Sequence, residues 1–73
     1  MDDRKREAFA RLAERRTNAV LERIRLLGNL SNPYAYSYGE EDVRLIFTAI
    51  ERELKAARAK FQNHRKPQFK LPR

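Results

Sequence analysis

The sequence has no cysteine and no tryptophan, and its 73 residues include one histidine, two glycines and three prolines. Without cysteine the chain forms neither a disulfide bond nor a thiolate zinc site, which are two common ways of stabilising a very small domain. The single histidine, His64, has no second imidazole with which to hold a metal ion. The sequence also lacks a glycine-rich phosphate loop and paired carboxylates on an apolar wall. We therefore expect no enzyme, no catalytic residue, no metal site and no cofactor.

Long apolar segments are also missing. No run of about 18 apolar residues occurs, and the charged N-terminus is not followed by an apolar segment of the length found in signal peptides. From this we expect a soluble, intracellular protein that resides in the cytoplasm and does not enter a membrane.

The chain is rich in charged residues. Charged residues make up 37% of the sequence, and 17 Lys and Arg against 10 Asp and Glu give a formal net charge of +7. A chain this short forms one small domain at most. Its positive charge attracts polyanions or acidic protein surfaces without identifying either.

Two segments show the periodicity of amphipathic helices, over about residues 3–27 and 38–62. Gly28 predicts a left-handed stop for the first helix, and Ser37 with Glu40 has the spacing of a capping box before the second. The apolar positions of the first segment are Phe9, Leu12, Ala13, Val20, Ile24 and Leu27. Those of the second segment are Val43, Ile46, Phe47, Ile50, Leu54, Ala57 and Phe61.

The predicted fold class is all-α. The loop over residues 28–37 is long enough for residues 1–62 to form an antiparallel two-helix hairpin, and too long for a DNA-reading helix-turn-helix, whose turn has about three or four residues. We expect residues 63–73, which contain two prolines, to form an extended basic C-terminal tail. Two helices alone bury only one side of each apolar stripe. We therefore expect a second copy to complete a four-helix bundle, or the hairpin to dock on a larger protein.

The expected protein interface combines apolar, aromatic and basic residues. Its predicted members are Phe9, Arg16, Val20, Ile24, Tyr34, Tyr36, Phe47, Ile50 and Leu54. Arg16 interrupts the first apolar stripe. Either its stem lies over the stripe with its head in water, or it reaches an acidic residue such as Glu53 across an interface, or it binds an external anion.

Three tyrosines alternate along the loop, at positions 34, 36 and 38. In an extended segment their rings would project on one side. Such a row stacks single-stranded bases, anchors a protein interface, or closes the open end of a helical core. Tyr38 fits the last role because it lies beside the expected start of the second helix.

The tail carries basic residues with no acidic neighbour. Its candidate nucleic-acid-binding residues are Arg65, Lys66, Phe69, Lys70 and Arg73. A cationic arm with an aromatic ring neutralises phosphates and stacks on a base. The competing interpretation is an extended peptide in which Phe69 and Leu71 insert into a partner protein or fold over the hairpin.

Together these patterns favour a small non-enzymatic accessory protein that makes protein contacts through its apolar helical faces and touches nucleic acid with its tail. The alternative is a protein-directed regulator or inhibitor that binds an acidic surface of a larger enzyme through its arginines and tyrosines, without nucleic acid.

Overall fold

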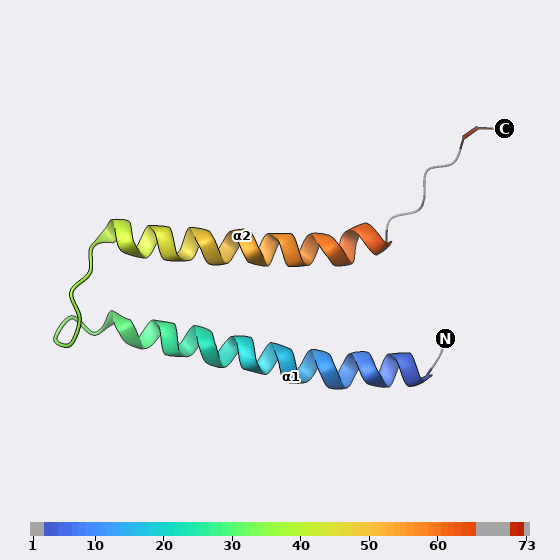
Figure 1. The fold of residues 1–73 in the computed structure, drawn as a ribbon, viewed down its shortest axis with the longest axis horizontal. Helices are drawn as coiled ribbons and strands as arrows, with labels where there is room; N and C mark the ends of the chain where they lie inside the picture. The colour runs from blue at the N-terminus through green and yellow to red at the C-terminus, as the bar shows by residue number, and fades with distance from the viewer. Residues whose placement is uncertain (1–2, 66–70, 73) are drawn as a thin grey trace. The chain divides into compact units, whose positions relative to one another are not determined.

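A computed structural model describes residues 3–65 and 71–72 of the chain. Helix α1 spans Asp3–Gly28, a short 3₁₀ helix η1 spans Asn29–Ser31, and helix α2 spans Glu40–Arg65 (Figure 1). The described part of the chain contains no strand, which confirms the all-α class. The chain divides into two units, Met1–Ser37 and Tyr38–Arg73.

Helix α1 has the charges that favour its two ends. Asp3 lies in the first turn and Arg25 in the last, where an acidic and a basic residue respectively complement the helix dipole. The prediction of a left-handed stop at Gly28 is wrong, because this residue has right-handed angles, φ −60° and ψ −27°. The chain passes into η1 through the same right-handed region, so α1 ends by tightening into a 3₁₀ turn.

The segment after η1 is organised around Asn32. The Tyr34 N–H donates to the side-chain oxygen Oδ1 of Asn32 at 3.0 Å, and the N–H groups of Ala35 and Tyr36 donate to the Asn32 carbonyl at 3.2 and 3.0 Å. This is the local side-chain turn that asparagine favours, with Pro33 at the position where its fixed φ suits a turn. Tyr34 lies inside this turn, so the extended backbone that would place the three tyrosine rings on one side is not present there.

Helix α2 begins at Glu40, two residues after the predicted start at residue 38. Its first-turn carboxylate Asp42 accepts a hydrogen bond from the Gly39 N–H at 2.9 Å, and the Val43 N–H donates to the Gly39 carbonyl at 3.3 Å. Gly39 is thus the residue before the first helical position, and it has no side chain to return the bond. The predicted Ser37–Glu40 box is therefore wrong. Of the two hydrogen bonds that make up a capping box, only the bond to the acidic side chain is present, and it joins Gly39 to Asp42.

The end of α2 lies at Arg65, three residues beyond the predicted end at residue 62. The first residues of the expected tail therefore continue the helix. Most of the remaining tail lies outside the described residues, and Leu71 and Pro72 have no regular secondary structure. Neither of the two long helices combines the length and apolarity needed to cross a membrane.

Candidate protein-interaction surface

The apolar side chains of both helices are open to solvent. Among the described residues none is buried. The predicted interface residues on α1 (Phe9, Arg16, Val20 and Ile24) are exposed. On α2 Phe47 and Leu54 are exposed and Ile50 is partly exposed. Each helix alone thus presents an apolar surface of the kind that marks an interaction site.

We call the apolar residues of each helix its stripe. The α1 stripe is Phe9, Leu12, Ala13, Val20, Ile24 and Leu27. The α2 stripe is Val43, Ile46, Phe47, Ile50, Leu54, Ala57 and Phe61. These residues recur every three or four positions, so an α-helix places them on one face.

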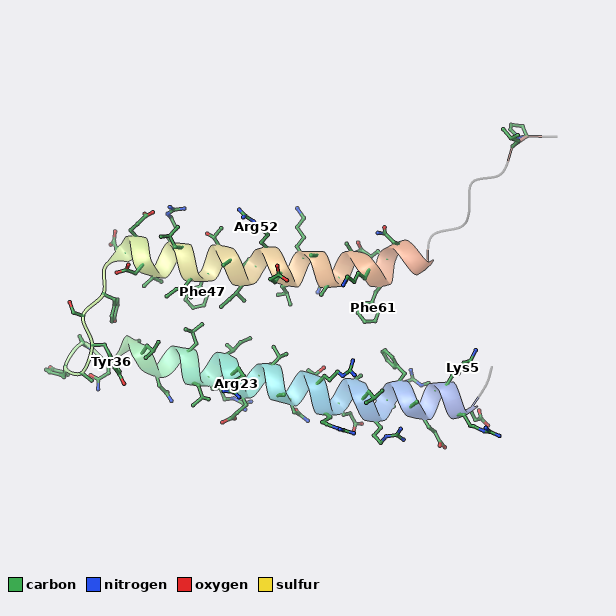
Figure 2. The ribbon with its side chains drawn as sticks, in the orientation of Figure 1. Lys5, Arg23, Tyr36, Phe47, Arg52 and Phe61 are labelled. Atoms are coloured by element: carbon green, nitrogen blue, oxygen red, sulfur yellow. The ribbon has the colours of Figure 1, made fainter. Side chains whose placement is uncertain are left out.

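The two faces of α2 are easily distinguished. Phe47 and Phe61 project from one side of the helix and Arg52 from the opposite side (Figure 2). Leu54 on the stripe is 62% exposed, whereas Leu45, on the other face, is 54% exposed. Exposure alone therefore does not separate the stripe from the rest of α2. Only the alignment of several large apolar residues does.

The charged residues beside the α1 stripe are all basic. At about 100° per residue, Lys5, Arg6, Arg16 and Arg23 lie within about 60° of the direction shared by Phe9 and Leu27. We call these four cations the α1 rim. The acidic residues of α1 (Asp3, Glu7, Glu14 and Glu22) lie about 120° or more from the same direction. The α1 stripe is thus bordered by positive charge alone.

The charged residues beside the α2 stripe are mainly acidic. Glu40, Glu51 and Glu53, which we call the α2 rim, lie within about 80° of the direction shared by Val43 and Phe61. Between Glu40 and Lys60, Arg58 is the one basic residue that lies as close. The border of the α2 stripe is therefore mixed, because Arg58 lies nearer to the stripe direction than Glu51 and Glu53 do.

Most rim residues were not singled out as functional by the apolar periodicity alone. The apolar periodicity indicates Arg16, with Glu53 as a possible partner, but it does not indicate Lys5, Arg23 or Glu51. The information that identifies them is the angle between each charged residue and the stripe, which the sequence contains once the helices are assigned.

Local ion pairs lie away from the stripes. The Arg44 guanidinium donates to both carboxylate oxygens of Glu41, through Nε at 3.0 Å and through Nη2 at a shorter separation. Arg25 donates to Glu22 at 3.4 Å.

The guanidinium of Arg6 lies 5.8 Å from the centre of the Phe9 ring, within the range of a cation–π contact.

The Glu41–Arg44 pair predicts a measurable titration. The hydrogen bond from Arg44 lowers the pKa of Glu41 from its usual value of 4.5. Since this pKa is lowered in the helix, the pair stabilises α2 above pH 4.5, and the contribution is lost as the pH falls through the lowered pKa. We expect Arg44→Gln to raise the pKa of Glu41 toward 4.5, measured from its carboxyl ¹³C shift. Arg25→Gln is the control, and equal Glu41 pKa values in wild type and Arg44→Gln would contradict the assignment.

The remaining predicted residues lie in the loop and the tail. Tyr34 is 97% exposed at the Asn32 turn, and Tyr36 and Tyr38 are also exposed. Arg65 is the last residue of α2, and nothing is described of its side chain. Lys66, Phe69, Lys70 and Arg73 lie outside the described residues. The predicted nucleic-acid contact therefore stays a prediction.

Comparisons with models of protein families, with curated proteins and with solved structures return no match. The function is accordingly derived from the residues of this chain.

Proposed function

We propose that this chain is a small non-enzymatic accessory protein of the cytoplasm that assembles through its helical stripes and contacts nucleic acid through its C-terminal tail. The observation that carries the proposal is the exposure of both stripes, since no described side chain is buried. Large apolar surfaces on amphipathic helices are stabilised when another helix covers them.

The proposed arrangement is an antiparallel hairpin of α1 and α2. Residues 29–39 provide a connection long enough for the chain to reverse. One neighbouring helix covers only one side of a stripe, so the hairpin needs further contacts. A second copy supplies them in a four-helix bundle, and a larger protein supplies them in a docked complex.

The nucleic-acid part of the proposal is supported by the charge of the tail. Residues 62–73 contain four Lys or Arg and no acidic residue. Phosphate neutralisation by such a segment releases counterions and gives salt-dependent binding that needs no base-specific groove contacts. Phe69 adds an aromatic ring on which a base stacks.

The tail predicts a loss of nucleic-acid affinity on neutralisation. We expect the variant Lys66→Gln/Lys70→Gln/Arg73→Gln to bind single-stranded DNA and RNA at least about tenfold more weakly, because three phosphate contacts are lost. Fluorescence anisotropy with labelled oligonucleotides at fixed salt measures the change. These substitutions follow Arg65, the last residue of α2, and so change no residue of the helix as described.

The matched control removes the same number of positive charges from the helices. Arg11→Gln/Arg15→Gln/Lys55→Gln changes residues that lie away from both stripes. It is expected to weaken binding much less than the tail variant. Equal losses in the two variants would show that only net charge matters, and equal affinity in wild type and the tail variant would remove the proposed contact.

The alternative function is regulation or inhibition of a larger enzyme through one of its acidic surfaces. The 97% exposure of Tyr34 at the Asn32 turn favours it, because an exposed tyrosine is a rigid anchor for a protein partner. Pull-down experiments repeated after nuclease treatment separate the two functions. A partner retained without nucleic acid, and lost in Tyr34→Ala, would support the regulator.

A further inference from the structure

We propose that Tyr34 is the anchor of a second protein-binding site, and that its ring inserts into a neutral, apolar pocket of a partner protein. The inference rests on the protein contact of the alternative function, and it specifies the pocket that makes this contact. The site lies outside both stripes, within the unit Met1–Ser37. Its evidence is the exposure of Tyr34, the hydrogen bonds that hold its backbone, and the absence of charge along the neighbouring chain.

Tyr34 presents nearly its whole side chain to solvent. It is 97% exposed, whereas Tyr36 in the same segment is 51% exposed. A tyrosine ring supplies a large contact area with few rotatable bonds, and tyrosine is enriched among the residues that dominate binding energy in protein interfaces. A ring that is almost fully exposed has nearly all of this area available for a partner.

The backbone that carries this ring is held in place before any partner binds. The Tyr34 N–H donates to Oδ1 of Asn32 at 3.0 Å. The N–H groups of Ala35 and Tyr36 donate to the Asn32 carbonyl. Pro33, between Asn32 and Tyr34, adds a fixed φ angle. A segment that is ordered before binding loses less conformational entropy on binding, so this turn favours a rigid anchor.

The segment around the turn contains no charged residue. The chain is uncharged from residue 26 to residue 39, although 37% of all its residues are charged. An acidic protein surface is attracted by cations, and this segment provides none. The pocket that fits Tyr34 is therefore neutral and apolar, with a polar group that pairs with the phenol O–H.

The same absence of charge disfavours a nucleic-acid base as the partner of the ring. A base that stacks on an aromatic side chain brings phosphates, which nearby Lys or Arg residues neutralise. The nearest cation before Tyr34 in the sequence is Arg25, which donates to Glu22. The nearest one after it is Arg44, which donates to Glu41. Both cations thus already have a carboxylate partner, and a protein pocket is favoured over a base.

Photocrosslinking of the full-length protein in the cells that produce it identifies what the ring contacts. The photoreactive residue p-benzoylphenylalanine replaces Tyr34 in one variant. In the control it replaces Leu45, which is exposed on the face of α2 opposite the stripe. After nuclease treatment, we expect a crosslink from position 34 to one other protein that the control does not capture.

The captured protein, once identified and purified, is used to measure affinity by isothermal titration calorimetry. We expect Tyr34→Ala to weaken binding at least about thirtyfold, and Tyr34→Phe, which keeps the ring, to weaken it much less. Asn32→Ala is expected to weaken binding by about threefold to tenfold, because the turn loses a hydrogen bond. Its matched control, Asn18→Ala in the middle of α1, is expected to bind like wild type.

The salt dependence of the same binding tests the neutral pocket. We expect the affinity to change by less than about twofold between about 50 and 500 mM salt, because exposed charges contribute little. None of the substituted side chains is buried, so circular dichroism is expected to show unchanged helix content in every variant.

Other outcomes overturn the inference. A crosslink from position 34 to nucleic acid, to a second copy of this chain or to nothing would contradict it. An affinity unchanged by Tyr34→Ala or by Asn32→Ala would contradict it as well. Binding that needs Tyr34 but falls steeply with salt would exclude the neutral pocket and leave the alternative function in place. A salt-insensitive partner that is not an enzyme would confirm the pocket and exclude only the regulatory role.

Discussion

Leu54→Asp is expected to weaken self-association by more than about a hundredfold, whereas Leu45→Asp in the same helix is expected to leave it nearly unchanged. Both leucines are exposed in α2, at 62% and 54%. Leu54 belongs to the α2 stripe and Leu45 lies on the opposite face. Because residue type and helix are the same, the two variants have a similar cost in helix propensity.

The expected size follows from the burial of the leucine side chain. Full burial of one leucine stabilises by about 1.5–3 kcal/mol, and a symmetric dimer loses it twice. The total of roughly 3–6 kcal/mol corresponds to a factor of about 10² to 10⁴ in the dissociation constant. An aspartate on the stripe adds the cost of placing a carboxylate against an apolar surface.

Sedimentation equilibrium over a range of concentrations measures both dissociation constants. Circular dichroism at 222 nm on the same samples reports whether helix content follows assembly. If the two substitutions weaken association equally, the stripe does not form the interface. If Leu45→Asp is the more damaging, the interaction surface lies on the other face of α2.

The positions of both helices could be predicted from the sequence because each contains a long apolar period. In α2, seven stripe residues recur at three- and four-residue steps, and such a repeat fits no other regular structure. Residues 40–62 are therefore helical both in the prediction and in the structure. The ends differ, because an end depends on individual hydrogen bonds and not on a period.

The two wrong terminal predictions have a common physical origin. Glycine permits the left-handed conformation, but Gly28 stays right-handed and the chain tightens into η1. Ser37 permits a cap, but Asp42 binds the Gly39 N–H instead. At both helix ends, more than one local conformation can satisfy the terminal backbone N–H and C=O groups. Residue preferences alone do not decide between these conformations.

The conformation of the tyrosine segment depends on local hydrogen bonds in the same way. The alternation of Tyr34, Tyr36 and Tyr38 assumes an extended backbone, while Asn32 and Pro33 favour a turn at the same place. The local hydrogen bonds to Asn32 prevail. The basic border of the α1 stripe, by contrast, is contained in the sequence and needs only the angular position of each charged residue.

Thermal unfolding of the wild-type protein is expected to depend on its concentration. If the stripes are covered by a second copy, folding and association are coupled, and dilution favours the separate, unfolded chains. For a dimer of this size a hundredfold dilution is expected to lower the melting temperature by roughly 5–10 °C. A single folded chain would melt at the same temperature at every concentration.

The mass of the nuclease-treated protein in solution, followed by sedimentation equilibrium while helix content is recorded over the same dilution series, tests the central claim most directly. Obligatory covering of the stripes by a second copy predicts a particle of twice 8.7 kDa that loses helix as it dissociates. A helical 8.7 kDa particle that keeps its helix content and melts cooperatively at high dilution would contradict it.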